Sequence, residues 1–275
     1  MKKILVLFTL LISFSFANEY SCREALNLSK EFTKNDYYNT EVFILVDEST
    51  YFDENSKEGI FKKISPFIKE NVRINIDSFT EYSKTRKNKD LGSYFIYSNL
   101  TKEEEDEISR SKVRDLKECL ENAKIFAYNG IKKNLEKAYR KKEDHLKKSE
   151  ILRNLKIYSK NNIRYSDAKR KVVIILSDML ENSEYLSFYK NGKVKEIDIE
   201  KEMEIVKKNR LLGKFNNAEI YVYGLGLVEV NSVKEDSRNS KILDNLIDFW
   251  DEYFTQSGGK PIGLDSSNMN FDIKY

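Results

Sequence analysis

Short apolar runs alternate with amphipathic stretches along most of the chain. Residues 41–50 (EVFILVDEST) form a nearly continuous apolar run that ends in an acid, as expected for a strand buried on both faces. Residues 54–70 then place apolar residues at helical spacing, and residues 72–82 alternate like a strand with one covered face. A third strand is predicted over 93–100, paired with the second across the polar turn 83–90.

The second half of the chain continues this alternation. The predicted elements are a long helical stretch from Lys102 to about Tyr158, a buried strand over 171–180, a hairpin turning at Asn191-Gly192, a helix over 199–212, a buried strand over 218–227 and an amphipathic helix over 240–259. Strands that alternate with helices predict an α/β fold with a doubly wound, mainly parallel sheet flanked by helices. We expect one domain over 41–259, followed by a tail, 260–275, that either adds a strand or stays loose.

The first seventeen residues are typical of a secretory signal peptide. Lys2 and Lys3 form a charged start, an apolar run follows, and residues 15–17 (SFA) provide a small-x-small cleavage site. An uncleaved anchor is the alternative, but the apolar run is too short to span a bilayer comfortably. We therefore expect cleavage of 1–17, an N-terminal segment over 18–40, and a periplasmic or secreted protein with no stable membrane span.

Composition and charge exclude several kinds of site. The 275 residues are 40% hydrophobic and 34% charged, which is typical of a soluble globular protein. The 48 basic residues outnumber the 45 acidic ones only slightly, and two of the lysines belong to the signal peptide, so nucleic acid is not an expected partner. The single histidine, His145, lies in a Lys-rich stretch and is expected on a solvated helix, which excludes histidine-rich zinc sites.

Export changes how the two cysteines, Cys22 and Cys119, are interpreted. An even number of cysteines in an oxidising compartment favours one disulfide. It would tie the N-terminal segment to a helix and close a loop of about a hundred residues, for which chain-entropy models give roughly 4–5 kcal/mol of stabilisation. Two buried free thiols are the alternative that spacing alone leaves open.

Two of the predicted central strands end in an aspartate next to a hydroxyl residue. Asp47 is followed by Glu48 and Ser49, and Asp178 is preceded by Ser177. In an open parallel sheet, ligands bind outside the carboxyl ends of the strands. Carboxylate and hydroxyl oxygens together suit Mg²⁺ or Mn²⁺, which need few protein ligands. The alternative is that both acids cap the helices that follow.

The order of elements resembles the von Willebrand factor A (vWA) family. In that family the first strand ends in D-x-S-x-S, a later loop supplies a threonine and a central strand ends in an aspartate, which together form a metal-ion-dependent adhesion site. Here VDESTY supplies Asp47 and Ser49, and KVVIILSDMLENS is similar to the central strand, with Asp178 in the metal-loop position. Ser149 in SEILRNL fits the loop hydroxyl best, and Thr101 is a weaker choice. The resemblance implies a site for Mg²⁺, with Mn²⁺ as a substitute.

The chain departs from the family pattern at three points. Tyr51 stands where the third motif position has serine, and a phenol cannot replace a small hydroxyl ligand without moving the loop. Met179 stands where glycine is common. Asp47 and Ser149 are 102 positions apart, which implies a helical insertion near 102–145. The adhesion site is therefore expected to be degenerate.

The resemblance implies a binding protein and not a catalyst, because vWA domains mostly bind protein partners. Their metal can complete its coordination with a carboxylate of the partner. A metal-dependent phosphohydrolase, with Asp47 as nucleophile or ligand, is the alternative from another class. DEST lacks the second aspartate of D-x-D-x-T, no histidine is nearby, and Gly224-x-Gly226 is not a full nucleotide fingerprint.

A metal-free scaffold of the same fold is a further alternative. Its contact surface would be the aromatic residues of the predicted hairpin, Tyr185, Phe188 and Tyr189. Aromatic residues in hairpins more often form cross-strand packing pairs. The sequence leaves the metal-bound and metal-free versions both open.

Overall fold

The computed structural model describes residues 22–26, 28, 38–80, 88–139, 149–227, 240–264 and 273–275. The predicted signal peptide, 1–17, and His145 lie outside the described residues. Within the described part of the chain, no helix has both the length and the apolar composition that crossing a membrane requires.

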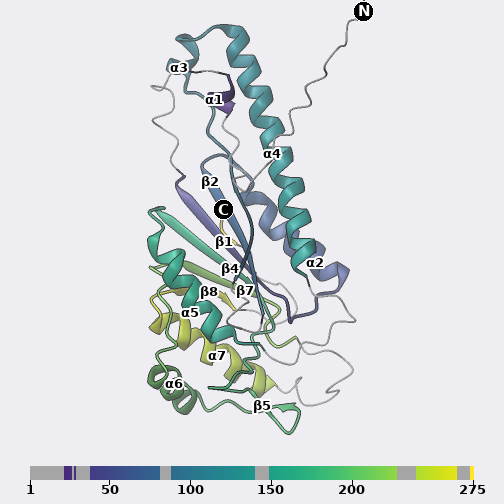
Figure 1. Cartoon of the computed structure of the whole chain (residues 1–275), viewed down its shortest axis with the longest axis vertical. Helices are drawn as coiled ribbons and strands as arrows, with labels where there is room; N and C mark the ends of the chain where they lie inside the picture. Colours follow the sequence, from purple (N-terminus) through teal and green to yellow (C-terminus); the bar gives the residue numbers. More distant parts are fainter. Residues whose placement is uncertain are drawn as a thin grey trace, which may run out of the picture.

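A six-stranded sheet in the order β3-β2-β1-β4-β7-β8 forms the centre of the fold (Figure 1). Its strands are β1 (Thr40–Asp47), β2 (Val72–Phe79), β3 (Lys89–Phe95), β4 (Arg170–Leu176), β7 (Glu219–Tyr223) and β8 (Lys260–Leu264). All neighbours are parallel except β3, which pairs antiparallel with β2. The predicted mainly parallel α/β sheet is confirmed, and the tail supplies its terminal strand. The strand order reverses between β1 and β4, where open α/β sheets bind ligands.

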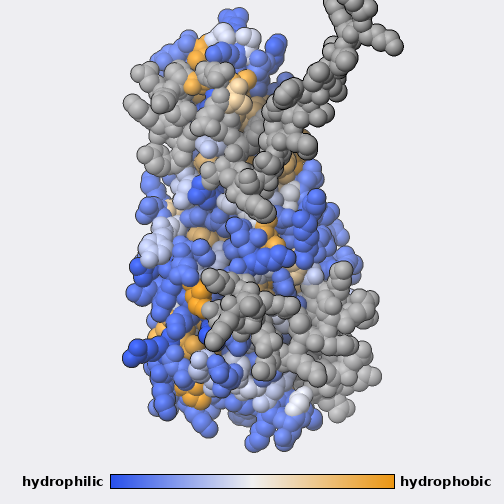
Figure 2. All heavy atoms as spheres, in the orientation of Figure 1, coloured by the Kyte–Doolittle hydropathy of each residue, from blue (hydrophilic) through white to orange (hydrophobic). Residues whose placement is uncertain are grey.

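Helices cover both faces of the sheet (Figure 1). One face packs on α2 (Glu54–Ile64) and α4 (Arg110–Ala138), and the other on α5 (Ile151–Asn161), α6 (Ile199–Lys208) and α7 (Ser240–Gln256). The shorter elements are α1 (Cys22–Ala25), α3 (Lys102–Asp106), the 3-10 turns η2 (Ser65–Phe67) and η3 (Ile163–Tyr165), and the ribbon strands β5 (Tyr189–Lys190) and β6 (Lys193–Val194). On the face drawn in Figure 2, the coloured surface is mostly hydrophilic, with small, separate hydrophobic patches.

The apolar run of β1 is explained by burial on both faces. Val42 and Ile44 pack in the cluster with α2 and α4, whereas Phe43 and Leu45 pack in the cluster with α5 and α7. A strand in the middle of a parallel sheet therefore needs apolar residues at every position. β4 follows the same rule, which is why both strands could be recognised from the sequence.

The single helical stretch predicted from Lys102 to about Tyr158 is wrong. The described residues of this range form three helices, and α4 ends at Ala138, where Tyr139 takes extended backbone (φ −63°, ψ 135°). α4 and α5 lie on opposite faces of the sheet, so one straight helix could not supply both. The predicted third strand also begins earlier than expected, at Lys89, inside the segment assigned to the turn.

The predicted hairpin at Asn191-Gly192 is confirmed, because β5 and β6 pair antiparallel across it. Both turn residues have positive φ, 53° and 77°, as a tight hairpin turn requires. The aromatic contact surface assigned to this region is wrong for Phe188. Its side chain is fully buried, and its ring lies edge-on to the Phe249 ring at 5.0 Å.

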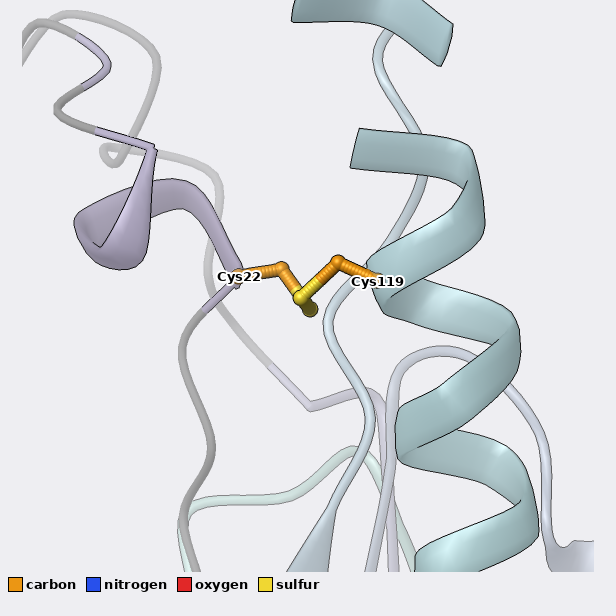
Figure 3. Close-up of a disulfide and its surroundings, with 2 residues drawn as sticks. All are labelled: Cys22 and Cys119. Atoms are coloured by element: carbon orange, nitrogen blue, oxygen red, sulfur yellow. A yellow bond between two sulfur atoms is a disulfide. The ribbon is translucent and has the colours of Figure 1, made fainter. Parts of the chain in front are cut away.

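A small separate cluster lies at the end of α4 that extends beyond the sheet, beside α1 and α3 (Figure 1). Cys22 of α1 and Cys119 of α4 form a disulfide there, with their Cα atoms 5.8 Å apart (Figure 3). The buried residues around it are Leu28, Leu100, Leu116, Leu120 and Ala123. The N-terminal segment is thus tied covalently to the helix in the predicted insertion.

Candidate functional site

The carboxylate of Asp47, at the end of β1, is the centre of a buried polar cluster. Its Oδ1 accepts hydrogen bonds from the backbone N–H of Ser49 at 2.9 Å and from the Ser49 hydroxyl at 2.5 Å. Its Oδ2 accepts from the hydroxyls of Ser177 at 2.8 Å and Ser149 at 3.1 Å. The structure therefore brings three of the four predicted metal ligands, Asp47, Ser49 and Ser149, into direct contact.

Asp47 is fully buried, and its charge is compensated by these donors. Burial raises the pKa of its carboxyl above the ordinary value, and the hydrogen bonds from Ser49, Ser177 and Ser149 act in the opposite direction. Each carboxylate oxygen already accepts two hydrogen bonds, and the three serine hydroxyls converge on this one carboxylate. A cation bound beside them would favour the ionised form further.

Asp178, the fourth predicted ligand, lies in the loop after β4 and is half-buried. Its backbone N–H donates to the Thr50 hydroxyl at 2.9 Å, and its Oδ1 accepts from the N–H of Leu180 at 2.9 Å. These bonds join the loop after β1 to the loop after β4. Burial raises the pKa of Tyr189, and the charges of Asp178 and Asp47 raise it further, so its hydroxyl lies within electrostatic reach of both carboxyls.

The loops that carry Ser149 and Asp178 are fixed to each other. The N–H of Asn182 donates to the backbone carbonyl of Ser149 at 2.9 Å. The buried carboxyl of Glu181 accepts from the N–H of Leu152, in the first turn of α5, also at 2.9 Å. Burial raises the pKa of Glu181 to about 8. The cluster around Asp47 is therefore preorganised by bonds from its own loops.

Two departures from the vWA pattern have a structural explanation. Met179 takes a left-handed backbone conformation (φ 59°), the region that glycine adopts most easily. The indole of Trp250 donates to the Met179 carbonyl at 2.9 Å and holds this turn. At the third motif position Tyr51 is half-buried, and the neighbouring Thr50 supplies the buried hydroxyl.

Sequence reasoning missed Thr50, and it noted Ser177 beside Asp178 without including it among the ligands. Both are direct neighbours of residues in the predicted ligand set, in VDESTY and in LSDML. Small hydroxyl residues at the ends of two adjacent parallel strands were the available signal. The spacing alone could not show that Ser177 shares an oxygen of Asp47 with Ser149.

The donor set is made of oxygen atoms only and fits Mg²⁺. Asp47 and Asp178 supply carboxylates, Ser49 and Ser149 supply hydroxyls, and a hydroxyl can rotate to direct a lone pair away from Asp47. Mg²⁺ usually keeps several waters and binds one or two carboxylates. Among the described residues, no group of three or more His, Cys, Asp or Glu side chains is placed to hold a metal. A site here would depend on hydroxyls and water.

The comparisons with known proteins give only a distant likeness in fold. No model of a protein family matches the chain, and no curated protein matches it. A conserved hypothetical protein, BatB from Bacteroides thetaiotaomicron, is similar with 13% identity and a TM-score of 0.36, over 83% of this chain and 92% of that one. An aerotolerance-related membrane protein from Bacteroides fragilis NCTC 9343 is similar with 12% identity and a TM-score of 0.34, over 84% and 93%.

Proposed function

We propose that this chain is an exported, vWA-like protein-binding module that holds a partner protein in the cell envelope through the carboxyl edge of its sheet. Mg²⁺ is held there by Asp47, Ser49, Ser149 and Asp178. The observation that carries the proposal is the meeting of Ser49 and Ser149, far apart in sequence, on the two oxygens of one buried carboxylate. It lies next to the reversal in strand order.

Each residue has a defined part in this proposal. Asp47 fixes the side chains of Ser49 and Ser149, because its oxygens are their hydrogen-bond acceptors. Asp178 is half-buried at the same edge and is the carboxylate that solvent and a partner can reach. A bound Mg²⁺ supplies the positive charge that attracts a carboxylate of the partner.

Export is supported by the disulfide between Cys22 and Cys119, because such bonds persist in oxidising compartments. The signal-like start of the sequence agrees with this location. Burial of Asp47 counts against a phosphohydrolase that uses Asp47 as its nucleophile, because a nucleophilic carboxylate must be reached by its substrate. We therefore assign a binding role and not a catalytic one.

The test is capture of partners from envelope extracts by the mature protein, residues 18–275, with Mg²⁺ and again with a chelator. We expect the same partner to be lost in chelator and lost with Ser149→Ala or Asp178→Asn. Asp115→Asn, at a half-exposed acid on α4, is the matched control and should keep the partner. Binding that survives both chelator and the two site variants would contradict the metal-dependent function.

A metal-free scaffold of the same fold is the second candidate. The observation that favours it is the full set of hydrogen bonds on Asp47, two to each oxygen, which stabilises the cluster without a cation. Under this function the edge still contacts the partner, but chelator has no effect on capture. Loss of the partner on adding chelator would exclude it.

A further inference from the structure

A hollow of about 760 Å³ lies on the α5 side of the sheet and shares no lining residue with the Asp47 cluster. It lies between the strands β1, β2 and β3 on one side and α5 with η3 on the other. Its volume is in the range that small-molecule sites occupy, roughly 300–1,000 Å³. It is far larger than a single metal ion requires.

The alternation of β2 produces this hollow. Ile74 and Ile76 pack in the apolar cluster with α2 and α4. On the opposite face β2 presents Asn75 and Asp77, and β3 places Ser93 directly across from Asn75. On the same face, β1 continues with Phe43 and Leu45 and β4 with Val173 and Ile175, which pack in the apolar cluster with α5 and α7. The polar residues of β2 and β3 therefore interrupt the apolar core at this edge of the sheet.

A hydrogen-bonded chain fixes the floor of the hollow. The Ser93 hydroxyl donates to Asn75 Oδ1 at 2.8 Å, and Asn75 Nδ2 donates to Glu41 Oε1 at 2.9 Å. The Ser166 hydroxyl donates to the other oxygen of Glu41. These contacts connect β3, β2, β1 and the residue after η3. They also direct the donors of the floor toward protein acceptors and away from a ligand.

Asp77 is the least compensated acid of the hollow. The Tyr158 hydroxyl donates to its Oδ2 at 2.5 Å, and its Oδ1 receives no hydrogen bond from a described residue. Asp90 lies opposite it on β3, and burial together with this second carboxylate raises the pKa of Asp77 to about 6. Glu41, Asp77 and Asp90 line the hollow, and none of the described lining residues is Lys, Arg or His.

Apolar and aromatic surfaces accompany these acids. Phe43 and Ile157 line the hollow, and Tyr165, at 64% exposure, lies at its rim. Arg73, outside the lining, has its guanidinium over the ring of Tyr38 at 4.5 Å. Carboxylates beside apolar walls match a ligand with a cationic end and a carbon chain.

We propose that this hollow binds an organic cation, an alkylammonium whose N–H groups donate to Asp77 and Asp90 and whose carbon chain packs on Phe43 and Ile157. An ammonium group has three donors and no acceptor, which suits the carboxylates of Asp77 and Asp90. Among the described residues, no group of three or more His, Cys, Asp or Glu side chains is placed to hold a metal ion in this hollow. This inference does not rest on the proposed function of the Asp47 edge.

The experiment is calorimetric titration of the mature, oxidised protein with 1,5-diaminopentane and with Nα-acetyl-lysine amide. The neutral 1,5-pentanediol has the same chain length and is the control ligand. Tighter binding of the diamine assigns a free amine, and tighter binding of the blocked lysine assigns a lysine side chain of another protein. Saturable heat from the diol, or none from either amine, would overturn the proposal.

Variants locate the binding. Asp77→Asn should weaken the preferred amine roughly tenfold or more, because a charge-assisted hydrogen bond is lost. Asp90→Asn should weaken it less, and Asp115→Asn on α4 should leave it unchanged. Circular dichroism of each variant keeps a folding defect distinct from a binding defect. Equal affinity of wild type and both hollow variants would place the amine elsewhere and refute the site.

Discussion

Asp47 and Asp77 are acids on neighbouring strands of one sheet, and their carboxylates accept different numbers of hydrogen bonds. Asp47 accepts four hydrogen bonds, two on each oxygen, from its own loops. Asp77 accepts one hydrogen bond, from Tyr158, and has a second carboxylate opposite it. Burial raises the pKa of both. A buried acid with a full set of donors organises a structure, whereas one that lacks them leaves acceptor capacity for a ligand.

The disulfide gives the largest expected effect and separates overall stability from both acids. Its partners are 97 positions apart, so chain-entropy models predict a loss of roughly 4–5 kcal/mol in the double variant Cys22→Ser/Cys119→Ser. Urea unfolding of the oxidised wild type and the variant measures this. Because the bond lies at the far end of α4, Mg²⁺ and amine binding below the unfolding midpoint should not change. A change in either binding constant would show that the two acids are not locally organised.

Asp47→Ala should cost roughly 2–4 kcal/mol of unfolding free energy, because it leaves three serine hydroxyls and one backbone N–H without their acceptor. The measurement is denaturant unfolding at pH 7. Asp178→Asn is the matched control, since Asp178 is half-buried and should cost less than half as much. A loss below about 0.5 kcal/mol for Asp47→Ala would show that the carboxylate does not organise the cluster.

Asp77→Asn should have the opposite sign and stabilise the protein by about 1–3 kcal/mol at pH 7.5. The unfolded carboxyl titrates near 3.8 and the folded one near 6, so the folded state retains the proton between these values. Stability from neutral Asp77 is therefore present below pH 4 and is lost as pH rises through 6. Asp90 faces it from β3 and Tyr158 faces it from α5, whereas Glu41 lines the same hollow from β1 beside Asn75.

Unfolding of wild type and Asp77→Asn at pH 4 and pH 7.5 tests this. The stabilisation should shrink to about 0.6 kcal/mol at pH 4, where the folded carboxyl is neutral and the unfolded one, with a pKa near 3.8, is only partly ionised. A variant that is less stable than wild type at pH 7.5 would mean that ionised Asp77 is compensated by the protein itself. The contrast with Asp47 would then fail.

Ser149→Ala gives the smallest expected stability effect, about 0.5–1.5 kcal/mol, because it removes one of the four hydrogen bonds to Asp47. Ser177→Ala is the comparison on the same oxygen, but it also removes the acceptor of the Met179 N–H at 2.9 Å. It should therefore lower the unfolding free energy by more than Ser149→Ala does. Of these two serines, only Ser149 is a metal ligand in the proposed function, so Ser149→Ala should weaken Mg²⁺ binding directly and Ser177→Ala should not.

The central strands were predictable because burial on both faces requires a continuous apolar run, as in β1 and β4. The end of α4 at Ala138 was not, because the sequence after it, YRKKEDHLKK, contains no glycine or proline. What ends the helix there is the need to cross to the other face of the sheet. That requirement arises from the tertiary fold, so no residue next to Ala138 signals it in the sequence.

The two candidate sites also differed in how far the sequence predicted them. Asp47, Ser49 and Ser149 were identified through their resemblance to a known motif, and the structure places them in contact. The hollow was missed, because the polar positions of 72–82 were interpreted as an ordinary exposed face. A single sequence does not show that α5 partly covers those positions and that β3 adds Asp90 beside Asp77.

The most direct test of the central claim is isothermal titration calorimetry of the mature protein with Mg²⁺, beside Ser149→Ala, Asp178→Asn and the control Asp115→Asn. The account predicts saturable binding of one Mg²⁺ per chain to wild type and to Asp115→Asn, and at least tenfold weaker binding to the two site variants. No saturable heat in wild type, or equal affinity in all four proteins, would contradict a metal site at the Asp47 edge.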